Sequence, residues 1–319
     1  MTPDLRDTDG ATDAETATHA DPAALAEVWP TTGGVDPPVD AVRAAVASAI
    51  AEDVGPAGDL TAMLVAESEV GRVRVVSRAE GVLAGRLCAL AAFSQIDRSI
   101  EVDWQILDGG WLEPGSVVAE VSGSMRSILT AERTALNFLC HLSGIATRTR
   151  RFVDAVTAAN PATRVLDTRK TTPGLRVLEK AAVRAGGGWN HRAGLSDAVL
   201  VKDNHLGRLG ITQAVTAARR SWPGLMVEVE CDRPEQVSEA VAAGASAVLL
   251  DNMTPSLVSE CVALVRAARA PGIVLVEASG GVTLDSAPAF AAAGADLISV
   301  GSITHSAPIL DLGLDLVED

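Results

Sequence analysis

Charged side chains follow short apolar runs in the second half of the chain, where they could bind anions or metals. Residues 167–171 (Asp-Thr-Arg-Lys-Thr) come after the run 165–166, and residues 202–205 (Lys-Asp-Asn-His) come after the run 198–201. Guanidinium and ammonium groups bind carboxylates and phosphates. A single residue of this kind is usually a solvated loop side chain, so the prediction depends on the repetition of the pattern.

The later apolar runs lead into carboxylates or small residues. The third run contains Glu228 and Glu230, and the fourth is followed by Asp251. The fifth leads into residues 277–281 (Glu-Ala-Ser-Gly-Gly), and the sixth into residues 301–302 (Gly-Ser). Paired carboxylates can hold Mg²⁺ or sugar hydroxyls, and small residues let backbone N–H groups approach a phosphate. The sequence therefore predicts a small, phosphorylated and multiply anionic substrate.

The basic residues between Arg164 and Lys202 are informative because the chain as a whole is acidic. It has 26 Lys and Arg residues against 41 Asp and Glu residues, a formal net charge of -15. Such a charge repels nucleic acids and anionic membranes, so we expect neither as a partner. We expect the basic segment to form one wall of a pocket, and the Gly-rich segment 186–192 could fold over its mouth.

The apolar runs alternate with Ala-rich helical stretches, which is typical of parallel strands linked by crossover helices. A weak repeat of helix end, glycine and strand supports this fold. Ligands of such folds bind at the carboxyl ends of the strands, where the charged residues are found. The pattern does not decide between a reduced barrel and an open doubly wound sheet. The expected strands cover residues 165–166, 198–201, 226–229, 247–250, 273–276 and 297–300.

The first half of the chain predicts a separate α+β domain. Residues 1–36 form an acidic leader that has too little apolar surface to bury, so we expect it to be disordered. A helix is expected from Val39, followed by a one-sided sheet between residues 70 and 121. Two further helices are expected, one ending at Gly144 and the next covering residues 145–159.

Several other classes of protein are excluded by the sequence. The four cysteines are far apart and form no C-x-x-C pair, which argues against a disulfide framework or a zinc site and fits a reducing cytoplasm. The first residues lack the features of a signal peptide, and no run reaches the roughly 18 apolar residues of a membrane span. The common motifs for nucleoside triphosphates and dinucleotides do not occur.

Nine multi-residue motifs occur in order along the chain. They lie at residues 130–137, 141–147, 167–174, 190–192, 202–205, 228–230, 250–252, 279–281 and 301–306. These motifs resemble those of the quinolinate phosphoribosyltransferase family, and the resemblance extends from about Val39 to the end of the chain. Because the motifs are long and keep their order, coincidence is a poor explanation.

The resemblance implies a fold, a reaction and partners. The fold is the type II phosphoribosyltransferase architecture: an N-terminal α/β sandwich of residues 37–145, joined by residues 303–319, and a reduced α/β barrel of residues 146–302. The reaction joins quinolinate to phosphoribosyl pyrophosphate with release of pyrophosphate and CO₂. Its product is nicotinate mononucleotide, a precursor in NAD biosynthesis. The resemblance also implies a requirement for Mg²⁺ and a homodimer.

Roles for individual residues follow from the same resemblance. Lys170, Lys202, Glu230 and Asp251 would be catalytic, and Glu230 and Asp251 would also hold Mg²⁺. Arg133 would reach into the site of the partner subunit. The substrate-binding residues would be Arg133, Thr168, Arg169, Lys170, His191, Arg192, Lys202, Glu230, Asp251, Ser279, Gly280, Gly281, Val300, Gly301 and Ser302.

Three other functions are compatible with parts of the pattern. A Schiff-base lyase or aldolase could use Lys202 or Lys170 at a strand end. A paralogue associated with molybdenum transport would share the fold, and a metabolite-binding regulator would share the pocket without the reaction. Borohydride trapping with substrate would distinguish the Schiff-base enzyme. Quinolinate-dependent release of CO₂ together with pyrophosphate would exclude the paralogue and the regulator.

Overall fold

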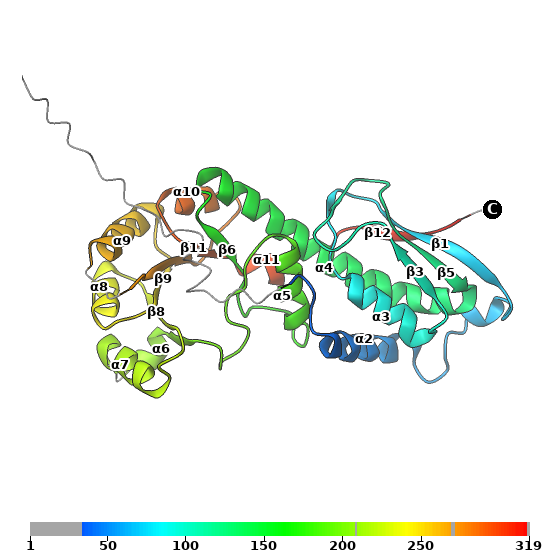
Figure 1. The fold of residues 1–319 in the computed structure, drawn as a ribbon, viewed down its shortest axis with the longest axis horizontal. Helices are drawn as coiled ribbons and strands as arrows, with labels where there is room; N and C mark the ends of the chain where they lie inside the picture. Colours follow the sequence, from blue (N-terminus) through cyan, green and yellow to red (C-terminus); the bar gives the residue numbers. More distant parts are fainter. Residues whose placement is uncertain (1–33, 208, 269–271, 318–319) are drawn as a thin grey trace, which may run out of the picture.

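The computed structural model describes residues 34–207, 209–268 and 272–317. They form two domains that share one long helix, α4 (Met125–Ala159), which runs from one domain into the other (Figure 1). The expected leader, residues 1–36, lies almost wholly outside the described residues.

An antiparallel sheet forms one layer of the N-terminal domain. Its strand order is β12-β1-β5-β3. Strand β12 comes from the end of the chain and pairs with β1, which places Leu314 opposite Val75. The C-terminal segment therefore completes the N-terminal sheet. The strands cover Leu312–Leu316 (β12), Val70–Ser77 (β1), Val117–Ser124 (β5) and Glu101–Trp104 (β3).

Helices form the second layer of this domain, on one face of the sheet (Figure 1). Along β1, Val73 and Val75 are buried while Arg72 and Arg74 are exposed, as the alternation in the sequence predicts. The helix expected from Val39 is confirmed. The helical elements here are α2 (Val39–Val54), the short η1 (Ala62–Leu64), α3 (Arg86–Ile96) and the first half of α4, and a short strand pair joins β2 (Gly81–Val82) to β4 (Trp111–Leu112).

The prediction of two helices that meet at Gly144 is wrong, because α4 continues through this residue without a break. Gly144 permits close packing instead. A Cβ atom there would lie 2.1 Å from Pro308 O and 2.9 Å from Ile309 Cα. The neighbouring Ser143 Oγ also donates to Ala84 O, at 3.1 Å. The glycine therefore marks the place where the returning C-terminal segment touches α4.

The second domain is a parallel sheet of six strands in the order β6-β11-β10-β9-β8-β7. Successive strands lie side by side from β7 onward, and the last strand returns to pair with the first. A doubly wound sheet would instead place later strands on both sides of the first. The order therefore favours a reduced α/β barrel, open between β6 and β7. The strands cover Arg164–Leu166 (β6), Val199–Val201 (β7), Val227–Cys231 (β8), Ala247–Asp251 (β9), Leu275–Ser279 (β10) and Leu297–Ser299 (β11).

Helices follow each barrel strand and cover the outside of the barrel (Figure 1). They are α5 (Arg176–Ala185), α6 (Asp203–Leu206), α7 (Ile211–Ser221), α8 (Pro234–Ala242), α9 (Pro255–Ala267), α10 (Ala287–Ala292) and α11 (Ser302–His305).

The Gly-rich segment 186–192 lies along the free edge of β6. Trp189 forms a parallel bridge there, and its N–H donates to Val165 O at 2.8 Å. A Cβ atom on Gly188 would lie 2.6 Å from Thr149 Cγ2, so the glycine allows α4 to approach. The segment is packed into the barrel wall and does not fold over the pocket mouth as the sequence suggested.

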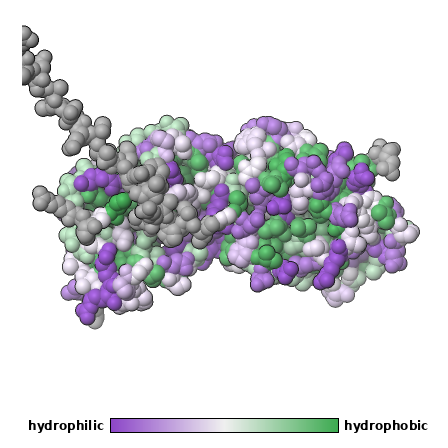
Figure 2. Space-filling model, in the orientation of Figure 1, coloured by the Kyte–Doolittle hydropathy of each residue, from purple (hydrophilic) through white to green (hydrophobic). Residues whose placement is uncertain are grey.

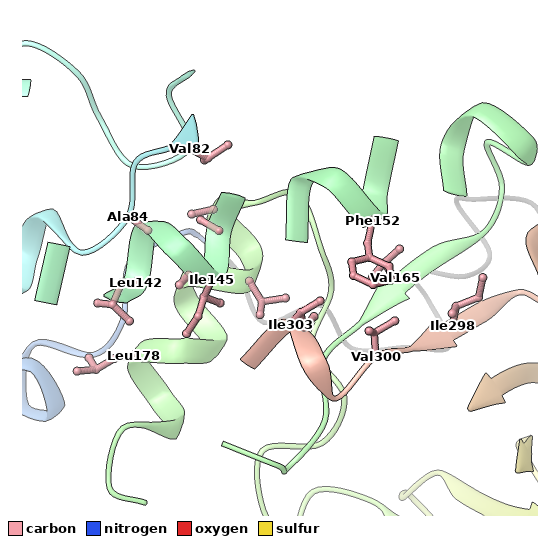
Figure 3. Packing of buried hydrophobic residues seen from close by; sticks show 14 of the residues in the cluster. Val82, Ala84, Leu142, Ile145, Phe152, Val165, Leu178, Ile298, Val300 and Ile303 are labelled. Carbon is pink, nitrogen blue, oxygen red and sulfur yellow. The ribbon is translucent and has the colours of Figure 1, made fainter. Parts of the chain in front are cut away.

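One apolar core extends through both domains. In Figure 3, Leu142 and Ile145 on α4 lie between the barrel and the N-terminal-domain segment at Ala84, which follows β2, and Phe152 lies beside Val165 on β6. All five side chains belong to a single buried cluster. Helix α4 is therefore the common core element of the two domains.

A smaller apolar cluster lies separately from this core. Its members are Leu166, Ala247, Leu275 and Leu297, and Trp189 and Met226 pack against it. Because the flanking residues on the strands belong to the outer core, strand alternation places this cluster inside the barrel. Ala247, Leu275 and Leu297 are the first residues of β9, β10 and β11, so the cluster lies toward the amino-terminal end of the barrel interior.

The surface has a mixed character. Hydrophilic and hydrophobic residues are interspersed over the face shown in Figure 2. Within the described ranges, no helix combines the length and the apolar character needed to cross a membrane.

Replacing Gly144 by alanine is expected to destabilise the protein, even though alanine favours helix by about 1 kcal/mol over glycine. The new Cβ atom would overlap the Pro308 backbone, and overpacking of this kind costs about 1–3 kcal/mol. We expect a lower midpoint of thermal unfolding. Gly224→Ala is the matched control, since nothing lies within 4 Å of a Cβ atom there. Equal losses in both variants would contradict the packing explanation.

Candidate active site

Predicted site residues lie at the carboxyl ends of the barrel strands. Asp251 and Ser279 end β9 and β10, where they are direct neighbours in the register. Glu230 lies near the end of β8, and Lys202 follows β7. Residues 169–170 follow β6. Since all six strands are parallel, these positions share one rim of the barrel.

Lys202 and Glu230 form an ion pair across this rim. Their side chains are 41% and 16% exposed, so both remain accessible from the pocket. Lys202 also caps α6, where its backbone N–H donates to His205 Nδ1 at 3.0 Å. A phosphate that binds Lys202, or a cation that binds Glu230, would compete with the ion pair.

Arg169 and Arg192 bring two positive charges close together. Burial lowers the pKa of Arg192, and the charge of Arg169 lowers it further. Arg192 Nη1 donates to Ala198 O at 3.0 Å. The Nε atom of Arg169 is buried and has no hydrogen-bond partner in the described part of the chain. Two like charges held in this way favour the binding of an anion.

The loop after β10 requires glycine. Gly280 has a φ of +91°, and a Cβ atom there would lie 2.3 Å from Asn252 Oδ1. Asn252 itself has a positive φ of 56° and donates its N–H to Ser279 O at 2.9 Å. Gly281 follows with a φ of +59°. Because Gly280 and Gly281 have no side chains, a phosphate can approach the backbone N–H groups of this loop.

The loop after β11 adjoins Lys170. A Cβ atom on Gly301 would lie 3.2 Å from Lys170 Cδ, so the lysine side chain lies directly over this glycine. Thr304 Oγ1 donates to Lys170 O at 2.7 Å, and Ser302 Oγ accepts from Arg148 Nη2 at 3.3 Å. A cationic side chain and an accessible backbone segment are thus placed side by side.

Thr168 and Val300 stabilise the backbone of the rim through hydrogen bonds. Thr168 Oγ1 accepts from Lys170 N–H at 3.0 Å, which fixes the turn after β6. Val300 is buried in the outer core, and its N–H donates to Leu166 O at 2.9 Å. The side chain of Val300 therefore points away from the pocket.

His191 lies buried beneath the rim in a hydrogen-bond network. Asp167 accepts from Lys180 Nζ, Asn190 Nδ2 and His191 N–H. Lys180 also donates to His191 O at 2.8 Å. The ring atom His191 Nδ1 accepts from Arg192 N–H at 2.8 Å. The positions of His191 and Arg192 are therefore set by a buried ion pair.

Two carboxyl groups without a role in the sequence prediction lie against His191. Glu228 Oε2 and Glu277 Oε1 are 3.2 Å and 3.6 Å from His191 Nε2. The sequence pattern placed Glu277 in a loop, but β10 continues to Ser279 and turns Glu277 into the barrel. Glu277 is two residues from both Leu275 and Ser279, and alternate residues of a strand lie on the same face. This spacing was the signal in the sequence that could have placed Glu277 inside the barrel.

Some basic residues between Arg164 and Lys202 do not belong to the rim. Arg164 begins β6, at the opposite end of the barrel, and lies 5.5 Å from the ring centroid of Trp189. Arg176, Lys180 and Arg184 are bound by other protein groups. The expected basic wall is therefore reduced to four side chains, those of Arg169, Lys170, Arg192 and Lys202.

Arg133 is not brought to the rim of its own barrel. It lies on the N-terminal half of α4, and its side chain is 64% exposed. Its Nη2 atom lies 4.0 Å from Oε1 of the adjacent Glu132.

Both halves of the chain match known family models. Residues 59–143 match the N-terminal domain of quinolinate phosphoribosyl transferase, and residues 145–315 match its C-terminal domain. The two matches together cover nearly all the described residues.

Individual relatives give the same result. The chain is 41% identical over 267 residues to the probable nicotinate-nucleotide pyrophosphorylase (carboxylating) of Bacillus subtilis, covering 83% of this chain and 90% of that one. Identity to the enzyme of that name from Mycobacterium leprae is 42%, covering 87% and 98%. The solved nicotinate-nucleotide pyrophosphorylase from Francisella tularensis superposes with a TM-score of 0.84 at 39% identity, covering 90% and 100%. The chain therefore belongs to the quinolinate phosphoribosyltransferase family.

Proposed function

We propose that the protein transfers a phosphoribosyl group from phosphoribosyl pyrophosphate to quinolinate with loss of CO₂, giving nicotinate mononucleotide and pyrophosphate for NAD biosynthesis. The main support is one barrel rim, in a chain of this family, that combines paired guanidinium groups, two carboxylates and two glycine loops. Each group suits one part of the substrates, namely the dicarboxylate, the ribose and the 5-phosphate.

In this proposal, the basic side chains orient the anions for reaction. Arg169 and Arg192 hold the quinolinate carboxylates, while Lys170 and Lys202 meet pyrophosphate. The pyridine nitrogen attacks ribose C1 as pyrophosphate leaves, and the positive charge that develops on the ribose is stabilised by a rim carboxylate such as Asp251. The resulting pyridinium withdraws electrons, so the C2–carboxylate bond breaks, CO₂ leaves, and C2 takes up a proton.

Glu230 and Asp251 suit Mg²⁺ binding, because they supply oxygen ligands from adjacent parallel strands. Mg²⁺ commonly uses one or two carboxylates together with phosphate oxygens, and when bound it would neutralise charge on pyrophosphate. Glu230 would then release Lys202 from their ion pair. The freed ammonium group would face the pyrophosphate.

The second part of the proposal is a homodimer in which Arg133 of each subunit enters the site of the other subunit. Three large apolar side chains of the η1 segment, Leu60, Met63 and Leu64, are 68%, 59% and 86% exposed. This segment adjoins the α4 turn before Arg133, since Thr130 Oγ1 donates to Asp59 Oδ2 at 3.1 Å. Exposed apolar residues beside an exposed arginine are typical of an interface between subunits.

The rival functions have less support. A Schiff-base lysine needs a desolvated site or cationic neighbours, whereas Lys202 is 41% exposed and paired with Glu230. The molybdenum-transport paralogue and the non-catalytic regulator would share the fold of the proposed enzyme but not its reaction. An activity assay therefore distinguishes them. The four free cysteines agree with a cytoplasmic enzyme.

The proposal predicts that CO₂ and pyrophosphate form in equal amounts when quinolinate, phosphoribosyl pyrophosphate and Mg²⁺ are supplied together. A coupled assay would follow both products, with nicotinate in place of quinolinate as the substrate control. Chelation of Mg²⁺ should stop the reaction. Product formation from nicotinate but not from quinolinate would refute the proposed substrate.

Alanine at Arg169 or Lys202 should lower kcat/KM by roughly 10²–10³-fold, because each removes a charge that contacts the substrates. The unfolding midpoint should change little, since both side chains lie at the rim. Arg164→Ala is the matched control, because this arginine lies at the other end of the barrel. Near-normal activity of either rim variant would contradict its role.

Co-expression can test the shared site. Arg133→Ala and Lys202→Ala subunits should each be inactive alone, whereas random pairing of the two should restore about a quarter of wild-type activity. The restored sites would combine an intact Arg133 with an intact barrel. Pairing Arg169→Ala with Lys202→Ala is the control, because both changes affect the barrel and leave no dimer with an intact site. If the first pair gave no more activity than the control pair, donation of Arg133 would be ruled out.

A further inference from the structure

Three ionisable groups lie together beneath the pocket. His191, Glu228 and Glu277 each offer one ligand atom within 4.8 Å of the others, and all three residues are buried. The apolar cluster that contains Leu275 and Leu297 closes the barrel below them. Two ionised carboxylates are strongly disfavoured in such a place unless a proton or a cation compensates for them.

The hydrogen bonds around these groups are incomplete. Both oxygens of Glu277 and Glu228 Oε1 are buried and lack a hydrogen bond of ordinary geometry among the described residues, although His191, Glu228 and Ser299 lie close enough to Glu277 to influence its pKa. The other oxygen of Glu228 faces His191 Nε2 at 3.2 Å. A proton between the two carboxyl groups would give Glu228 Oε1 its missing donor.

The tautomer of His191 argues against a metal ion at this position. Its Nδ1 atom accepts from Arg192 N–H at 2.8 Å and therefore carries no proton. The ring proton is then on Nε2, which faces the two glutamates. A protonated nitrogen cannot ligate a metal. The imidazole is thus neutral and donates a hydrogen bond.

We propose that Glu277 is a positioning residue: it remains a neutral carboxylic acid and donates its proton to Glu228, so that Glu228 can hold His191 Nε2–H. His191 in turn accepts the backbone N–H of Arg192. Through this chain of hydrogen bonds, Glu277 determines the position of Arg192, which the proposed function assigns to quinolinate binding. The consequence for catalysis rests on that function, whereas the charge state of Glu277 does not.

The surroundings of Glu277 agree with this assignment. Burial raises its pKa to about 8, the charge of Glu228 raises it as well, and His191 opposes them. Burial lowers the pKa of His191, and the charge of Glu277 is the largest influence that would raise it, to about 9. That influence disappears when Glu277 holds a proton, and the influences that still raise the pKa of His191 then come from Glu228 and Asp167. A neutral Glu277 therefore favours the neutral ring that the hydrogen bond from Arg192 N–H requires.

A neutral Glu277 also preserves the positive charge of the pocket. Glu228 already acts electrostatically on Arg192. A second ionised carboxylate would offset more of the charge that attracts a dianion. The groups facing Glu277 are Glu228 from β8, His191 from the barrel wall and the Ser299 hydroxyl from β11. Quinolinate should therefore bind less well above about pH 8, where Glu277 loses its proton.

Two variants of similar shape test the proposal. Glu277→Met removes the donor and should raise the KM for quinolinate about tenfold, with a smaller effect on the KM for phosphoribosyl pyrophosphate. Glu277→Gln supplies an uncharged donor, so it should rescue quinolinate binding and abolish the rise in KM above pH 8. A glutamine variant as impaired as the methionine variant would overturn the proposal.

Carbon NMR of the wild-type protein labelled at the glutamate carboxyl carbon gives a readout that does not depend on activity, and its main result comes from the wild-type protein. One carboxyl resonance should titrate near pH 8, and it should be absent in folded Glu277→Gln. Titration of every glutamate in the ordinary acidic range would refute a neutral Glu277. So would metal analysis that finds an ion retained by wild type and lost in Glu277→Gln. If the protein lacked activity with quinolinate while the resonance was present, the proposed function would fail and the charge assignment would remain.

Discussion

The buried ion pair between Asp167 and Lys180 determines the arrangement of one side of the pocket. Burial raises the pKa of Asp167 and lowers that of Lys180, so both charges depend on their partners. Asp167 accepts three donors, from Lys180, Asn190 and His191. The pair thereby joins the end of β6, helix α5 and the segment that leads to Arg192. Each of these three elements carries or supports a basic side chain of the rim.

The interior of the barrel has three layers with different physical roles. Buried apolar side chains form a floor toward the amino-terminal end. Above it, Glu228, Glu277 and His191 form a polar layer, and Lys202, Glu230 and Asp251 form the charged rim. The floor makes the middle layer a poor environment for net charge, whereas the rim stays accessible to water. Because the apolar interior beneath the rim has a low dielectric constant, charge interactions at the rim are stronger than they would be in water.

The two domains depend on each other for stability. Helix α4 contributes to both parts of the core, and β12 returns from beyond the barrel to the N-terminal sheet. Gly144 allows the returning segment to lie against α4. Because Arg133 is carried by the same helix, its position relative to the barrel is fixed by core packing rather than by a flexible linker.

The sequence by itself determined the order of elements and the chemistry of the rim. Strands form where short apolar runs alternate with helical stretches, and residues such as Lys202 and Asp251 follow those runs, so one parallel sheet must bring them to one edge. Local pattern also predicted the helix that begins at Val39 and the inward side of β1. These features depend on residues close in sequence, which is why a pattern can reveal them.

Only the tertiary structure decided what each charged or small residue does. Gly144 has the sequence character of a helix end, but its role comes from Pro308, more than 160 positions away. Arg164 and Arg169 are similar in sequence context, yet they lie at opposite ends of a strand. Glu277 followed an apolar run like the rim residues, and the length of β10 placed it inside the barrel beside His191. In each case the deciding contact is long-range, so it depends on the packing of the whole chain. For Glu277 the period of two indicated the face of the strand, but it did not indicate the contact with His191.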